Sequence, residues 1–154
     1  MIYNFIGQPH SGKTTLSNHL YNALKTNNPN REITILDGDL LRRILNNTKF
    51  DEEGRRQNIL QGYAIAKFLV KDDDRDVILA MVSPYKDLRE YLKLTSNNDV
   101  IEIYLHTSNI RGRENFHVAN FEPPFLDYID IDTTDVDELT SLNELLDKIE
   151  KFKK

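Results

Sequence analysis

The chain of 154 residues contains no cysteine. This absence excludes a disulfide scaffold, a zinc site built from thiolates and a cysteine nucleophile. Basic residues are also in deficit, because 20 Lys and Arg stand against 25 Asp and Glu and give a formal charge of −5. Non-specific nucleic-acid binding needs a broad basic face, so nucleic acid is not an expected partner.

Long apolar runs are missing as well. No stretch approaches the roughly 20 apolar residues that a membrane-spanning helix needs. The first six residues carry no Lys or Arg and are followed by a glycine, unlike the start of a signal peptide. We therefore expect a cytoplasmic protein without a membrane partner, folded as a single domain over residues 1–154.

Short apolar runs alternate with helical patterns along the chain. Strands are expected at residues 2–6, 33–36, 76–82, 100–105 and 128–131. Helices are expected at 13–25, after the second strand up to about residue 45, at 52–70 and at 87–94. A further helix is expected near the C-terminus, where the apolar stripe is Val136, Leu139, Leu142, Leu146 and Ile149. This alternation predicts a three-layer α/β/α fold of the P-loop kinase type, with a five-stranded, mainly parallel sheet. The charged segment 107–124 is predicted to form a short lid.

A phosphate-binding loop follows the first strand. Residues 7–14 match the pattern G-x-x-x-x-G-K-[ST] between a strand and a helix, which is the context that the motif requires. Backbone N–H groups of such a loop surround phosphates, the lysine neutralises their charge, and the hydroxyl that follows binds Mg²⁺. The predicted ATP-binding residues are Gly7, Gln8, Pro9, His10, Ser11, Gly12, Lys13, Thr14 and Thr15.

The positions of the acidic residues favour a kinase over a molecular switch or motor. The strand at 76–82 ends without the aspartate that a switch or motor needs, and no Asn-Lys-x-Asp motif occurs. Asp37 and Asp39 instead follow the second strand. A carboxylate there can hold a Mg²⁺-bound water or deprotonate an attacking hydroxyl. We therefore predict Asp37 and Lys13 as catalytic residues and Thr14 with Asp37 as Mg²⁺ ligands.

Four motifs in one order resemble those of the adenylylsulfate (APS) kinases. They are Asp-Gly-Asp-x-x-Arg at 37–42, Phe50 followed by Arg55 and Asn58, the helix at 64–69, and Ser-Pro-Tyr at 83–85 followed by Arg89. The resemblance covers about residues 1–90. It implies transfer of the ATP γ-phosphoryl group to a nucleotide-linked acceptor, with Mg²⁺ as cofactor, and it implies a homodimer.

The resemblance also implies an acceptor site. Its predicted residues are Asp39, Arg42, Phe50, Arg55, Asn58 and Ser83. Arg42 and Arg55 would bind an anionic group, and Phe50 would stack on a base. Structural alternatives stay open at these positions. Asp39 is also a favourable N-cap for the next helix, and a single phenylalanine is also a typical core residue. Ser83 could instead cap a loop, Asn58 could be a satisfied helix residue, and the two arginines could lie on the surface.

The second half of the chain departs from the family pattern. The segment 107–124 is shorter than the family's lid, and Leu60 stands where the family has a further arginine. Both differences predict lost acceptor contacts. Arg111 and Arg113 are predicted catalytic residues that stabilise charge on the transferred phosphoryl group. APS is therefore one expected acceptor, and the alternatives are a cytidine diphosphoramidate kinase of capsule modification, a kinase of hydroxymethylated DNA bases and a non-catalytic nucleotide-binding module.

Overall fold

The structure, a computed structural model, describes residues 1–109 and 118–154. Its strands are β1 (Ile2–Ile6), β2 (Ile33–Asp37), β3 (Asp76–Ala80), β4 (Val100–His106) and β5 (Tyr128–Asp132). Its helices are α1 (Lys13–Asn27), α2 (Gly38–Ile44), α3 (Glu52–Asp72), α4 (Lys86–Thr95) and α5 (Glu138–Lys153). Each element lies where the sequence predicts one.

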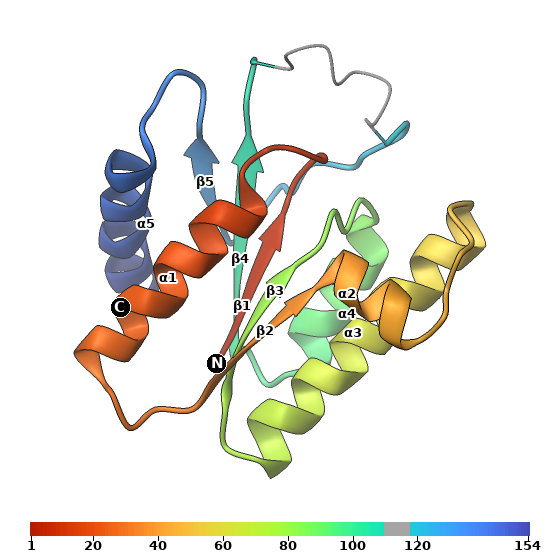
Figure 1. The fold of residues 1–154 in the computed structure, drawn as a ribbon, viewed down its shortest axis with the longest axis horizontal. Helices are drawn as coiled ribbons and strands as arrows, with labels where there is room; N and C mark the ends of the chain where they lie inside the picture. The colour runs from red at the N-terminus through yellow and green to blue at the C-terminus, as the bar shows by residue number, and fades with distance from the viewer. Residues whose placement is uncertain (110–117) are drawn as a thin grey trace.

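The strands form one sheet in the order β2-β3-β1-β4-β5 (Figure 1). Every neighbouring pair is parallel, so the sheet is wholly and not only mainly parallel. Because β1 is central, the loop that follows it lies in the middle of the edge where all carboxyl ends of the strands meet. In α/β sheets ligands bind at this edge.

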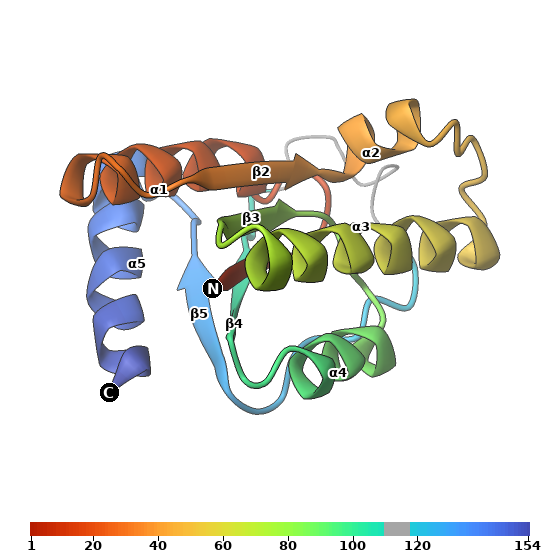
Figure 2. The same cartoon turned by 90° about the horizontal axis from the view of Figure 1, so that it is seen from below.

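Helices cover both faces of the sheet and complete the three layers (Figures 1 and 2). Successive strand residues point to opposite faces. Tyr3 and Phe5 accordingly pack in the core beneath α1 and α5, whereas Ile2 packs in the core beneath α3 and α4. The three-layer α/β/α prediction is confirmed. No helix in the described part of the chain has the length and apolar character to cross a membrane.

The C-terminal helix presents a different face to the core from the one expected. Val136 precedes α5, because the Asp137 side chain accepts a hydrogen bond from the Thr140 N–H and begins the helix there. Leu139 is 66% exposed. The fully buried residues of α5 are Ser141, Leu145 and Ile149, so the predicted stripe is wrong at its first two positions.

Candidate active site

A cleft of about 800 Å³ opens at the carboxyl ends of β1, β2 and β3. Its walls contain most of the predicted ATP-binding residues and all of the predicted acceptor-binding residues. The predicted residues that line it are Pro9, His10, Gly12, Lys13, Thr14, Thr15, Asp37, Asp39, Arg42, Phe50, Arg55, Asn58 and Ser83. The fold therefore brings together predicted residues up to 74 positions apart, from Pro9 to Ser83, in one cavity.

The phosphate-binding loop has the geometry of an anion site. Gly12, with φ of 100°, adopts a left-handed conformation just before α1, which glycine tolerates because it has no Cβ. The Lys13 side chain folds back over the loop, where its Nζ donates hydrogen bonds to the Gly7 carbonyl (3.0 Å) and the Gln8 carbonyl (2.9 Å). Burial lowers the pKa of Lys13 to about 8, although Asp37 and Asp39 act in the opposite direction.

Asp37 ends β2 and caps α2. Its Oδ1 accepts hydrogen bonds from the N–H groups of Asp39 (2.9 Å) and Leu40 (3.2 Å), and its extended backbone is typical of an N-cap. The alternative that Asp39 caps this helix is therefore wrong, because Asp39 lies within the first turn. Both carboxylates face the cleft and the Lys13 ammonium group.

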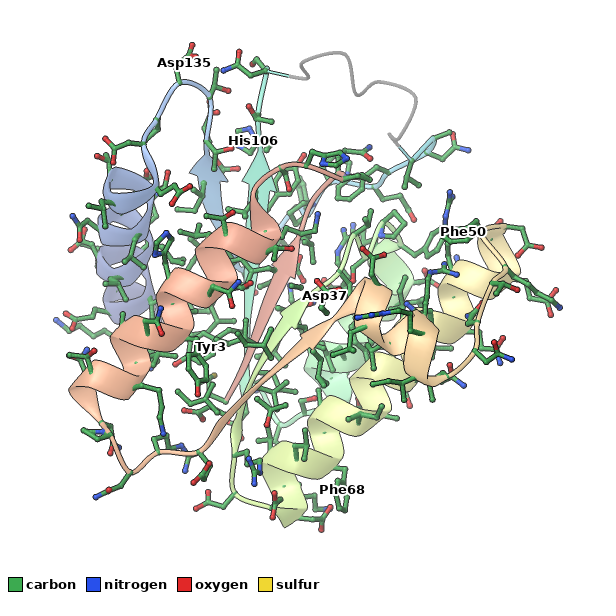
Figure 3. The ribbon with its side chains drawn as sticks, in the orientation of Figure 1. Tyr3, Asp37, Phe50, Phe68, His106 and Asp135 are labelled. Carbon is green, nitrogen blue, oxygen red and sulfur yellow. The ribbon has the colours of Figure 1, made fainter. Side chains whose placement is uncertain are left out.

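Phe50 lies in the loop between α2 and α3 and not in the core. Its side chain is 64% exposed and lines the cleft. The Arg42 guanidinium lies 4.2 Å from the centre of the ring, and its Nη1 donates a hydrogen bond to the Lys49 carbonyl (2.7 Å). Figure 3 shows Phe50 to one side of Asp37, at the far end of this loop. The alternative of a core phenylalanine is therefore wrong.

Two further acceptor-site candidates, Arg55 and Asn58, come from the first turns of α3. Burial and the charge of Arg55 both lower the pKa of Arg42, so the two guanidinium groups lie close enough to repel. Asn58 is buried, and its Nδ2 donates to the Gly38 carbonyl (3.3 Å). Within the described residues, the Asn58 Oδ1 has no hydrogen-bond partner. Paired cations and an unsatisfied acceptor suit an anionic ligand that carries a hydrogen-bond donor.

Ser83 forms the wall of the cleft where β3 ends. It is buried and has φ of 46°, a conformation that costs a non-glycine residue about 1 to 2 kcal/mol. The Tyr63 hydroxyl donates to its Oγ (3.4 Å), and Arg89 Nη1 donates to its carbonyl (2.8 Å). These contacts hold a strained residue at the site. The strand that was expected to reach residue 82 ends at Ala80.

A second cavity of about 270 Å³ lies on the other side of the phosphate-binding loop. Gly12, Thr15 and Leu16 form one side, and residues that follow β4 and β5 form the other. There the Asn109 Nδ2 donates to the Asp135 Oδ1 (2.7 Å). Asp135 and His106 are labelled on this side in Figure 3. Our sequence analysis missed this cavity, although parallel strands always end at the same edge and residues 107–109 and 133–136 follow two of them.

Some predicted residues have other positions or roles. The Gln8 side chain is directed to the backbone of Val118, with hydrogen bonds of 3.0 Å to its carbonyl and 2.8 Å from its N–H. Leu60 lies outside the cleft and lines a separate shallow groove on α3, and the loss of an acceptor contact at this position stays a prediction. Arg111 and Arg113 lie outside the described residues.

Comparison with known protein families finds a match over most of the chain. The family model described as adenylylsulphate kinase matches residues 1–115, about three quarters of the chain. The chain belongs to the adenylylsulphate kinase family. Family membership and the P-loop kinase fold thus agree with the order of motifs in the sequence.

Two curated relatives of this chain are named as kinases of different acceptors. A cytidine diphosphoramidate kinase of Campylobacter jejuni is 37% identical over 95 residues, which cover 62% of this chain and 54% of that protein. An adenylyl-sulfate kinase of Staphylococcus epidermidis is 38% identical over 106 residues, which cover 68% of this chain and 52% of that protein. The chain thus spans about half the length of the curated relatives it matches.

Solved structures of the adenylylsulphate kinase family share the fold. The Mycobacterium tuberculosis APS kinase CysC in complex with AMPPNP and APS superposes with a TM-score of 0.79 at 19% identity, over 97% of this chain and 96% of that chain. At this identity the likeness concerns the fold alone. It includes the second half of the chain, which the curated sequence matches do not fully cover.

Proposed function

We propose that this protein is an ATP-dependent kinase that transfers the γ-phosphoryl group to a hydroxyl of an anionic, nucleotide-linked acceptor, with APS as the first candidate. The observation that carries the proposal is the single cleft in which Lys13 and Asp37 face Arg42 and Arg55. A phosphate-binding half and an anion-binding half therefore share one cavity, which is the arrangement that direct transfer between two anions needs.

The nucleotide binds at the phosphate-binding loop that follows β1. Its phosphates bind the N–H groups of residues 7–15, and its base enters the second cavity beside Asn109 and Asp135. Lys13 then exchanges the Gly7 and Gln8 carbonyls for phosphate oxygens. Because those carbonyls carry only partial charges, the phosphates stabilise the ammonium group more strongly.

The acceptor hydroxyl attacks the γ-phosphorus atom in line with the bond to the β-phosphate. An O–P bond to the acceptor forms, the bond between the γ-phosphorus and the bridging oxygen breaks, and ADP leaves with that electron pair. Asp37 accepts the hydroxyl proton, since its carboxylate lies in the cleft at the end of β2. Arg42 and Arg55 hold the anionic part of the acceptor, and Phe50 stacks on its base.

Mg²⁺ is the metal that this donor set fits. Thr14 supplies a hydroxyl and Asp37 a carboxylate, both in the cleft, and Mg²⁺ commonly takes one or two protein oxygens together with phosphate oxygens and waters. Such a site does not require a cluster of protein ligands. The described residues contain no group of three or more His, Cys, Asp or Glu side chains that could hold a metal ion. When bound, the ion neutralises charge on the β- and γ-phosphates.

Three further parts of the proposal concern the lid, the cellular compartment and the oligomeric state. Residues 107–124 act as a lid of the single domain, in which Arg111 and Arg113 stabilise charge on the transferred group. The protein works in the cytoplasm. It forms a homodimer, which sedimentation velocity tests directly, and a monomer at micromolar concentration would contradict this part.

Cytidine diphosphoramidate is the second candidate acceptor. The relative that carries this name is 37% identical to this chain. The unpaired Asn58 Oδ1 also suits an acceptor with an N–H donor. The two candidates share a nucleotide and an anionic tail, so the cleft is compatible with either.

The test is kcat/KM for APS and for cytidine diphosphoramidate at saturating Mg·ATP. We expect a value of about 10⁴ M⁻¹s⁻¹ or more with one of them, within the ordinary range for enzymes. Asp37→Asn serves as the control for contaminating kinase. Tight ATP binding without turnover of either compound would overturn the proposal and would favour a non-catalytic nucleotide-binding module.

A further inference from the structure

Arg89 is the largest fully buried side chain in the described structure, and it lies outside the cleft. It belongs to α4 and is 1% exposed. A charged group in such a position needs several partners to offset the loss of water. The identity of those partners shows what the side chain does.

The two ends of the guanidinium group hold two walls of the cleft. Nη1 donates to the Ser83 carbonyl (2.8 Å), and Nη2 donates to the Glu122 carbonyl (2.6 Å). Ser83 lines the cleft directly, and Glu122 belongs to the segment that begins at Val118, another cleft residue. Segments 39 residues apart are thereby joined through one planar group.

Further contacts strengthen this junction. The Glu122 N–H donates to the Pro84 carbonyl (2.9 Å), and the Lys86 N–H lies 3.3 Å from the Glu122 carboxylate. Figure 2 shows the chain after residue 118 passing the beginning of α4. The wall at 83–84 and the segment at 118–122 therefore hold their relative position through Arg89 and its immediate neighbours.

The counter-ion of Arg89 is also buried. Glu102 on β4 is 1% exposed and lies 3.5 Å from Arg89 Nε and 3.2 Å from Lys93 Nζ. Buried ion pairs of this kind contribute little net stability, because removing both charges from water offsets their attraction. The planar guanidinium group of arginine donates hydrogen bonds in fixed directions and so fixes the positions of its partners, which lysine cannot do.

From these contacts, and on the basis of the proposed kinase function, we infer that Arg89 is a positioning residue for the acceptor half of the cleft. Its hydrogen bond to the Ser83 carbonyl keeps Ser83 in the left-handed conformation. Its hydrogen bond to the Glu122 carbonyl holds the segment that contains Glu122. The phosphate-binding loop receives no hydrogen bond from it. Arg89 holds Ser83 directly and reaches the loop only indirectly, through the Gln8–Val118 hydrogen bonds, so we expect loss of the fork to weaken the acceptor site more than the nucleotide site.

The variants for the test are Arg89→Lys and Arg89→Met, with Lys93→Met as the matched control. Arg89→Lys keeps the charge beside Glu102 but cannot donate in two fixed directions. Lys93 shares the same helix and the same buried carboxylate, yet it contacts neither Ser83 nor Glu122. The control therefore removes the ion pair with Glu102 and the Lys93 hydrogen bonds to the Leu126 and Asp127 carbonyls, while it leaves the fork to Ser83 and Glu122 in place.

The first measurement, amide hydrogen exchange, needs no acceptor. We expect exchange of the Glu122 N–H to rise about tenfold or more in Arg89→Lys and to stay within about threefold of wild type in Lys93→Met. Should Arg89→Met fail to fold, Arg89→Lys decides the result. Equal exchange in folded Arg89→Lys and Lys93→Met would overturn the role of Arg89.

The second measurement separates the two substrates. With APS and Mg·ATP, we expect KM for APS to rise about tenfold in Arg89→Lys while KM for ATP stays within about twofold. A parallel rise of both KM values would overturn the selective role. Absence of APS turnover by the wild type would count against the APS proposal, whereas the exchange result would still decide whether Arg89 holds the two walls.

Discussion

The carboxylate of Asp37 caps α2 and, in the proposed function, also takes part in the chemistry. It caps α2 through two backbone N–H groups and also faces Lys13 in the cleft. These two roles require different properties, since capping needs an oxygen acceptor and proton transfer needs a basic carboxylate. They can therefore be separated by the choice of substitution.

Asp37→Asn should remove turnover and keep the fold. Asparagine is as good an N-cap as aspartate, whereas alanine costs about 1 kcal/mol at such a position. We expect kcat to fall by about a hundredfold or more, with a melting temperature close to that of the wild type. Steady-state kinetics with Mg·ATP and calorimetry measure the two effects.

The control for this substitution is Asp39→Asn, because Asp39 shares the cleft but does not cap the helix. A collapse of kcat in Asp39→Asn together with an active Asp37→Asn would reverse the assignment of the base. Asp37→Ala should lose both activity and helix stability.

The lowered pKa of Lys13 makes nucleotide binding dependent on pH. In the free protein burial holds this pKa at about 8, and bound phosphates would raise it again. Above pH 8 binding must therefore take up a proton, so affinity falls as pH rises, by up to about tenfold per pH unit. Calorimetric titration with AMP-PNP at several pH values, in two buffers of different ionisation enthalpy, measures that uptake.

Lys13→Met is the control for proton uptake, since it removes the titrating group. An affinity of the wild type that does not change between about pH 7 and 9.5 would contradict the assignment. The same shift has an effect on folding. The folded, ligand-free protein binds fewer protons than the unfolded chain between pH 8 and the ordinary lysine pKa, so its stability rises with pH in that window.

The connection between α2 and α3 is fixed by a close approach of two backbones. A Cβ on Gly54 would lie 2.2 Å from the Lys49 carbonyl oxygen, which is the oxygen that Arg42 binds. Asn47 reinforces the contact, because its Nδ2 donates to the Gly54 carbonyl (2.9 Å). The position of Phe50, next to Lys49, therefore depends on the absence of a side chain at residue 54.

Gly54→Ala should damage the acceptor site and leave the nucleotide site intact. The added methyl group forces Lys49 away, which breaks its contact with Arg42 and moves Phe50. We expect KM for the acceptor to rise about tenfold and KM for ATP to change less than about twofold. Leu60→Ala, on the same helix but outside the cleft, should change neither value. Equal effects of both substitutions would contradict this explanation.

The ends of the elements were harder to predict than the elements themselves. Apolar runs located the central strands β1 and β3, because these parallel strands are buried on both faces, whereas β5 alternates buried and exposed residues. Leu139 was wrongly predicted in the core, because it lies in the first turn after the Asp137 cap, and α5 buries Ser141, Leu145 and Ile149 instead. Asp39 was considered as a cap because aspartate is favoured at that position, but the helix begins two residues earlier, at the Asp37 cap.

The candidate site was predictable to the extent that its residues stand in contiguous motifs. The phosphate-binding loop and the segment from Asp37 to Asn58 carry their own patterns, and the structure brings them together. Arg89 is different, because its partners Ser83, Glu122 and Glu102 lie on three separate segments. Contacts of this kind arise from the tertiary fold and leave no local pattern.

Taken over the entire chain, nucleotide binding should stabilise the fold. The phosphate-binding loop is tied to distant segments, through Gln8 to Val118 and through the Ser11 carbonyl to the Thr133 hydroxyl (3.1 Å). At a concentration 100 times its Kd, Mg·AMP-PNP adds about 2.7 kcal/mol, which corresponds to a rise of roughly 5 to 10 °C in Tm. Thermal unfolding with and without the ligand measures it. A wild type without any shift would contradict a nucleotide site, and Lys13→Met should show little or none.

The order of the strands also divides the cavity along the sequence. Most residues of the proposed acceptor site come from one continuous stretch, 39–58, on one side of β1. The loop after β1 and residues after β4 and β5 form the proposed nucleotide site. A lineage could therefore exchange one stretch of sequence and acquire a new acceptor without rebuilding its ATP site. The same modularity makes residues 38–60 a natural cassette for grafting between relatives that share this sheet.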